Sequence, residues 1–179
     1  MEPAVKKACE TTHTKKVLVL ATPATFKGEL YSSLVERFAS DTEIYKDVVE
    51  GLVREIEQGH TESKEVIDIL ESAIKPNIDK GIDTIVLGCT HYPFVIDKIQ
   101  NIAGEKVNII DPTNAIVHRV ENILKENNIA VESSDGNHMA IYTSGDIASM
   151  NVTASKLFKG NLNIMKLDWN NNYELNVVK

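Results

Sequence analysis

The sequence is poor in features that mark several large classes of protein. It has no run of about 18 apolar residues, the length that a membrane-spanning helix needs. Its first residues lack the apolar core of a secretory signal, so we expect a cytoplasmic protein with no membrane partner. Basic residues are also fewer than acidic ones: the sequence has 19 Lys and Arg and 26 Asp and Glu, which gives a formal net charge of −7. A nucleic-acid partner is therefore not expected, because the phosphates would be repelled.

Cysteine and paired histidines are scarce as well. The two cysteines, Cys9 and Cys89, are too few for a disulfide framework. The histidines are His13, His60, His91, His118 and His138, and their spacing matches no zinc site. The sequence also lacks a dinucleotide-binding glycine motif and a P-loop. We therefore expect neither a metal ion nor a bound nucleotide.

What the sequence does contain is an alternation of short apolar runs with amphipathic stretches. The runs at 16–22 and 82–87 are typical of strands buried on both faces of a parallel sheet. Further strands are predicted at 43–49, 107–110, 139–143 and 161–167, and helices at 28–39, 49–58, 63–80, 93–102, 115–126 and 147–158. This order predicts an α/β fold with an open, mostly parallel, doubly wound sheet and helices on both faces. Residues 132–137 are predicted as a polar loop and the tail beyond 172 as irregular.

Small and polar residues follow the predicted strands. They occupy residues 21–25, 88–91, 111–114 and 144–146. In open α/β sheets, ligands bind outside the carboxyl ends of the strands. We therefore expect the functional site at this edge of the sheet.

Cys89 is the main candidate for chemistry at that edge. Gly88 allows another group to approach the backbone closely. Thr90 can cap the helix predicted to follow, and Pro93 suits its first turn. Amides at a helix start favour a thiolate or bind a carboxylate, and His91 can transfer a proton nearby. The alternative interpretation is that Cys89 is only a small buried side chain.

Other candidates are weaker when taken one at a time. The loop that contains Thr22 and Thr25 could cradle a carboxylate or phosphate, or could be a simple turn. Glu50 and Glu57 are candidate carboxylates in a chain that has many surface charges. Cys9 lies in a helix-like stretch with no partner in view, which favours a structural role.

The run Gly88-Cys89-Thr90-His91-Tyr92-Pro93 resembles, residue for residue, the second catalytic cysteine motif of the glutamate racemases, in the aspartate/glutamate racemase family. Four other segments are similar to family segments: 1–4, 21–25 with Tyr31 following, 51–57 and 142–146. The likeness covers about residues 1–168. It departs at Val49-Glu50, where the family often has Cys-Pro. The family's first-lobe motifs, an Asp-Ser pair and a Cys-Asn-Thr strand end, have no counterpart, so the chain resembles the C-terminal portion of such an enzyme.

The resemblance implies a cofactor-independent isomerase that interconverts L- and D-glutamate and supplies D-glutamate for peptidoglycan synthesis, cell-wall biogenesis and cell shape. It implies two similar α/β lobes, each with one cysteine, on opposite sides of the substrate's α-carbon. An α-proton is a weak acid, so one thiolate removes it while a thiol protonates the other face. The resemblance implies that Cys89 is one of the two acid/base groups. It also implies that His91 assists Cys89 as a proton donor and that Glu57 supports the proton transfer. Substrate binding falls to Thr90, Thr22 and Thr25.

The same resemblance predicts how the chain is organised. Residues 1–110 are expected to form the second lobe, and 111–179 a segment that packs on the missing first lobe or on a partner. Without that lobe, the helices at 115–126 and 147–158 are expected to expose apolar residues: Ile116, Val120, Ile123 and Leu157. We expect a homodimer or a partner chain that carries the missing lobe.

Three alternatives stay open on the sequence alone. The substrate could be aspartate, because both branches of the family use paired cysteines. The chain could be a non-catalytic relic lobe that binds an acidic amino acid or a protein. It could also be a single-thiol enzyme that uses Cys89 and His91 for hydrolysis or transfer.

Overall fold

The computed structural model describes residues 2–131, 140–158 and 162–177. The chain forms two compact units. The first comprises Met1–Ile56 with His60–Ala130, and the second comprises Glu57–Gly59 with Val131–Lys179.

The first unit is built on a parallel sheet of four strands in the order β2-β1-β3-β4. The strands are β1 (Lys16–Leu20), β2 (Glu43–Asp47), β3 (Thr84–Leu87) and β4 (Asn108–Ile110). Every residue of β3 is buried, as are all residues of β1 after Lys16. These two strands are the continuous apolar runs of the sequence, and a strand at the centre of a parallel sheet is covered on both faces.

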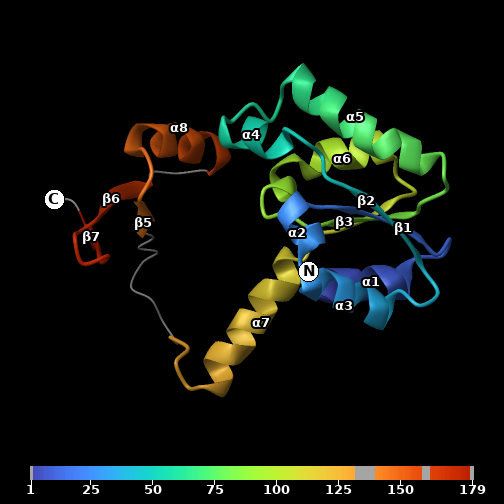
Figure 1. The fold of residues 1–179 in the computed structure, drawn as a ribbon, viewed down its shortest axis with the longest axis horizontal. Helices are drawn as coiled ribbons and strands as arrows, with labels where there is room; N and C mark the ends of the chain where they lie inside the picture. The colour runs from blue at the N-terminus through green and yellow to red at the C-terminus, as the bar shows by residue number, and fades with distance from the viewer. Residues whose placement is uncertain (1, 132–139, 159–161, 178–179) are drawn as a thin grey trace. The chain divides into compact units, whose positions relative to one another are not determined.

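Helices cover both faces of this sheet (Figure 1), which confirms the predicted α/β class. One face carries α1 (Glu2–Thr11) and α3 (Glu29–Phe38), and the other carries α5 (Lys64–Ile78) and α6 (Ile96–Ala103). The remaining helical segments are α2 (Pro23–Lys27), α4 (Leu52–Glu57), the 3-10 turn η1 (Tyr92–Val95) and α7 (Thr113–Glu126).

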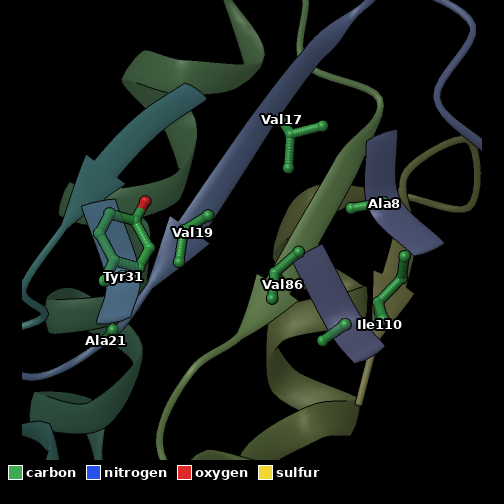
Figure 2. Close-up of a cluster of buried hydrophobic side chains, with 8 residues drawn as sticks. Ala8, Val17, Val19, Ala21, Tyr31, Val86 and Ile110 are labelled. Atoms are coloured by element: carbon green, nitrogen blue, oxygen red, sulfur yellow. The ribbon is translucent and has the colours of Figure 1, made fainter. Parts of the chain in front are cut away.

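The core between the sheet and helices α1 and α3 is formed by small and branched side chains together with Tyr31 (Figure 2). Its members are Ala4, Ala8, Val17, Val19, Ala21, Tyr31, Val86 and Ile110. The alanines of α1 lie on one side of that helix and let its backbone approach the sheet. Each buried valine or isoleucine contributes about 1.5–3 kcal/mol through removal of apolar surface from water.

Ser63 begins α5 as predicted. Its side-chain oxygen accepts a hydrogen bond from the amide of Val66 at 3.2 Å, which satisfies one of the free donors of the first turn. Pro76 lies inside the last turn of this helix, which continues to Ile78.

The second unit contains a separate sheet of three strands in the order β5-β6-β7. Strand β5 (Ala140–Thr143) is parallel to β6 (Asn163–Trp169), and β7 (Leu175–Val177) is antiparallel to β6. Helix α8 (Ile147–Leu157) begins at Asp146, whose carboxylate accepts from the amide of Ser149 at 2.7 Å. The polar loop predicted at 132–137 lies outside the described residues.

Strand β7 corrects the expectation of an irregular tail. The side-chain oxygen of Asn170 accepts hydrogen bonds from the amides of Asn172 and Glu174, both at 2.9 Å. These bonds close a turn that returns the chain alongside β6. Asparagine favours this local bonding, and the sequence analysis had assigned only the turn.

No helix in the parts of the chain that the structure describes combines the length and apolarity needed to cross a membrane.

Candidate active site

The ends of three neighbouring strands meet at one edge of the first sheet. Leu20 of β1 is in register with Asp47 of β2 and with Leu87 of β3. The pairing continues beyond the strands, because the amide of Gly88 donates to the carbonyl of Leu20 at 2.7 Å. The amide of Ala21 likewise donates to the carbonyl of Asp47 at 3.1 Å. The loops that follow β1 and β3 therefore leave the sheet side by side.

Cys89 and His91 lie together at this edge. The Sγ atom of Cys89 is 3.6 Å from Nδ1 of His91, within the range of a hydrogen bond to sulfur. Both side chains are half-buried, so the thiol is not sealed in the core. Cys89 is therefore not a fully buried side chain. A thiol beside an imidazole can exchange a proton with it or with a ligand at the open edge.

The helix predicted at 93–102 begins later than expected. The chain first makes the 3-10 turn η1, and α6 starts only at Ile96. His91 precedes η1 without a side-chain cap, and Thr90 is exposed, so Thr90 does not act as the predicted cap. Pro93 lies in the first turn of η1, and the α-helix starts after that turn. The thiol does not lie at the amino end of an α-helix.

Thr22 and Thr25 lie on the neighbouring loop, at the start of the short helix α2. Their hydroxyl oxygens are 3.1 Å apart, close enough for a hydrogen bond. The carbonyl of Thr22 accepts from the amides of Thr25 and Phe26 at 3.0 and 3.3 Å. The loop is therefore a tight turn whose two hydroxyls face one another beside the end of β1.

A cavity of about 440 Å³ adjoins this loop. It is lined by Glu2, Ala24, Thr25, Gly28, Leu30, Tyr31, Ser33, Leu34 and Arg37. Tyr31 packs edge to face on Phe26, with 5.1 Å between ring centres, and this contact holds α2 against α3. Burial, with a smaller effect from Cys9, raises the pKa of Tyr31 to about 12. The Tyr31 hydroxyl is buried without a hydrogen-bond partner.

The two candidate glutamates are exposed. Glu50 lies in the turn between β2 and α4. Glu57 is the last residue of α4 and belongs to the second unit. Its backbone carbonyl accepts a hydrogen bond from the hydroxyl of Thr153 at 2.5 Å. The residues that the structure brings to one edge are therefore Cys89, Thr90, His91, Thr22 and Thr25.

Cys9 lies at the opposite end of the strands. Its neighbours Lys15 and Thr42 directly precede β1 and β2. Burial raises the pKa of the Cys9 thiol. A hydrogen bond with the hydroxyl of Thr42 lowers this pKa and offsets part of the rise. Cys9 is buried, as its expected structural role requires.

Two residues near the site were not among the candidates from sequence. The hydroxyl of Tyr92 donates to the carbonyl of Val48 at 3.3 Å, and the carboxylate of Asp47 accepts from the amide of Val49 at 2.9 Å. Burial raises the pKa of Tyr92, and the nearby Cys89 and Asp47 raise it further. Asp47 ends β2 in the structure, whereas the predicted strand continued to residue 49 and hid that position. The contact of the Tyr92 hydroxyl with Val48 depends on the fold and has no local signal in the sequence.

The structure offers no group of three or more His, Cys, Asp or Glu side chains suited to a metal ion, in so far as its residues are described.

The first unit is thus a parallel α/β sheet with a thiol and an imidazole at its carboxyl edge. The family model described as Asp/Glu/Hydantoin racemase matches residues 1–120, and the chain belongs to this family.

Within the family, the chain is similar to glutamate racemases. The glutamate racemase of Clostridium perfringens (strain ATCC 13124) is 40% identical over 144 residues, which are 80% of this chain and 55% of that protein. The glutamate racemase of Sulfurovum sp. (strain NBC37-1) is 43% identical over 127 residues, which are 70% of this chain and 48% of that protein. The chain thus spans about half the length of these curated relatives and corresponds to part of a racemase.

Solved structures show the same fold. The glutamate racemase isoform RacE1 from Bacillus anthracis aligns with a TM-score of 0.80 at 23% identity, over 93% of this chain and 62% of that one. The Escherichia coli glutamate racemase, solved with L-glutamate and the activator UDP-MurNAc-Ala, aligns with a TM-score of 0.73 at 22% identity, over 98% of this chain and 64% of that one.

Proposed function

We propose that this chain supplies one of the two acid/base groups of a glutamate racemase. The observation that carries the proposal is the contact between Cys89 Sγ and His91 Nδ1, at 3.6 Å, on the open edge of the sheet. The likeness to glutamate racemases supports an acidic amino acid as the substrate, with glutamate ahead of aspartate.

The chemistry asked of the pair is the removal or return of the α-proton on one face of the substrate. Cys89 in its thiolate form takes the proton, and as a thiol it returns one. His91 exchanges protons with the sulfur and so resets Cys89 between turnovers. Thr22, Thr25 and Thr90 would donate hydrogen bonds to the substrate's charged groups. By the resemblance to racemases with paired cysteines, the reaction would use no cofactor.

One chain would serve only one face of the α-carbon. Cys9, its other thiol, lies at the far end of the strands from Cys89. The second acid/base would therefore come from another polypeptide, either a second copy or a chain with the missing lobe. With that partner, the assembly would supply D-glutamate for peptidoglycan synthesis.

Exposed apolar residues support the need for a partner. Ile116, Val120 and Ile123 of α7 are exposed, as expected, whereas Leu157 is half-buried. In the second unit, Ala154 is the one fully buried hydrophobic residue among those described. We propose that residues 111–179 contribute to the contact with the partner.

The test is exchange of the α-proton in deuterated water. The purified chain is incubated separately with L- and D-glutamate, and α-deuterium is followed by NMR. A single chain with one acid/base should label one enantiomer only, and Cys89→Ser should abolish the labelling. Cys9→Ser is the matched control and should leave the rate unchanged.

Other outcomes assign the partner or reject the proposal. Labelling of both enantiomers that depends on Cys89 and rises steeply with protein concentration would identify a second copy as the source of the other base. Labelling that persists in Cys89→Ser, or no labelling at all, would reject the catalytic role.

The position of Cys9 also favours a second candidate, a binding module without catalysis. A lobe with one thiol at its site can hold an acidic amino acid without inverting it. Glutamate or aspartate would then shift the amide resonances of residues 22–25 and 88–91 with no α-deuterium incorporation.

A further inference from the structure

The turn between β2 and α4 has an unusual backbone. Val49 has φ = +50° and Gly51 has φ = +86°. Glycine adopts positive φ readily, but a β-branched residue does so rarely, and only where the surroundings hold it there. Val49 is also buried, so its side chain is fixed in the core. The turn at 47–51 therefore needs contacts that maintain it.

Two hydrogen bonds hold this turn from opposite sides. From within, the Oδ1 atom of Asp47 accepts from the amide of Val49 at 2.9 Å. From outside, the hydroxyl of Tyr92 donates to the carbonyl of Val48 at 3.3 Å. Tyr92 is fully buried, so its hydroxyl has no water to replace this acceptor if the turn moves.

The same tyrosine also holds the cysteine loop. The backbone amide of Tyr92 donates to the carbonyl of Cys89 at 3.3 Å. Its side chain reaches the turn after β2, and its main chain is bonded to the residue that carries the thiol. Strands β2 and β3 are not neighbours, because β1 lies between them. No ladder hydrogen bond can join their ends, and the Tyr92 hydroxyl bridges the two loops instead.

We propose that Tyr92 is a positioning residue, which fastens the turn at 47–51 to the loop of Cys89 across the end of β1. The bridge keeps the thiol and the start of α4 in one fixed arrangement. Its effect on proton transfer rests on the function proposed above, whereas the coupling of the two loops does not depend on that function.

Asp47 provides matched variants. Asp47→Asn keeps an oxygen that can accept from the Val49 amide, whereas Asp47→Ala removes the acceptor. If Asp47 acts by this hydrogen bond, only the alanine variant should loosen the turn. Tyr92→Phe keeps the buried ring and removes only the hydroxyl that reaches Val48.

The experiment is amide hydrogen exchange by NMR together with alkylation of Cys89 by iodoacetamide over a range of pH. In Tyr92→Phe we expect exchange at the bonded amides of this turn, those of Val49 and Leu52, to rise about five- to tenfold, the factor for one lost buried hydrogen bond. Exchange in the centre of β1 should stay unchanged. The rate or pH profile of Cys89 alkylation should shift in the same variant, although residue 92 does not touch the reagent. Asp47→Ala should raise exchange at the same two amides, and Asp47→Asn should match the unmodified chain.

Three results would overturn the proposal. These are unchanged exchange at Val49 and Leu52 in Tyr92→Phe, a uniform rise across the sheet, and unaltered alkylation of Cys89. If glutamate exchange is measurable, Tyr92→Phe should lower kcat and leave KM unchanged. If no variant exchanges glutamate, the proposed function fails, while amide exchange and alkylation still decide the role of Tyr92.

Discussion

The carboxylate of Asp83 offers a sharp test of the physical account of the fold. It accepts hydrogen bonds from the Thr12 hydroxyl at 2.5 Å and from the amides of His13 and Thr14 at 2.7 and 2.8 Å. The Thr84 hydroxyl donates to it at 3.0 Å. These bonds join the loop between α1 and β1 to the start of β3. Partial burial alone would raise the pKa of Asp83, but the hydrogen bonds outweigh it and lower the pKa from 3.8 to about 2.

The lowered pKa sets the size and direction of the effect. The difference between 3.8 and about 2 corresponds to about 2 kcal/mol of stability for the ionised form. Because the folded-state pKa is the lower one, this stability is complete above about pH 5. It is lost as the pH falls through 3.8 toward 2. In Asp83→Asn, one side-chain oxygen becomes an NH₂ group that would face backbone donors, so we expect a loss of about 2–3 kcal/mol at pH 7.

Urea unfolding at pH 7 and at pH 2.5 measures this directly. The difference between the unmodified chain and Asp83→Asn should shrink markedly at the lower pH. Asp79→Asn, an exposed position nearby, is the control and should change stability by less than about 0.5 kcal/mol. An equal loss for Asp83→Asn at both pH values would refute the reasoning, because the effect could not then come from the ionised carboxylate.

Two further predictions concern single hydrogen-bonding groups. Tyr31→Phe removes a buried hydroxyl that has no partner and keeps the ring packed on Phe26. Thermal unfolding should therefore show a stability that is unchanged or raised by up to about 1 kcal/mol. A clear loss of stability would mean that the hydroxyl has a partner in solution. Ser63→Ala removes the cap of α5 and should cost about 1 kcal/mol in urea unfolding, whereas Ser63→Asp should restore it; equal stability of all three would contradict the cap.

The sequence predicted the parts of the fold that depend on local pattern. The centres of β1 and β3 are continuous apolar runs, and Ser63 stands where a cap is needed, so these elements were correct. The class of the fold followed from the alternation of strands and helices. The start of α6 was wrong, because Pro93 was taken to begin an α-helix and instead lies in a 3-10 turn. Strand β7 was missed because it forms only by pairing with β6, after the turn at Asn170 reverses the chain.

The site was predicted by residue type and completed only by the fold. Cys89 and His91 were recognised from their motif. Their side chains are in contact because they are two residues apart in a loop that bends. The bridge from Tyr92 to Val48 depends on the strand order β2-β1-β3, which no local pattern specifies. The thiol's distance from the start of α6 also depends on the conformation of η1.

The measurement that tests the central claim most directly is the rate at which this chain labels the α-carbon of glutamate in deuterated water, compared with Cys89→Ser. The account predicts labelling that requires the Cys89 sulfur and, for the single chain, is confined to one enantiomer. Equal rates with and without that sulfur would show that the thiol and imidazole at the sheet edge do not transfer the proton.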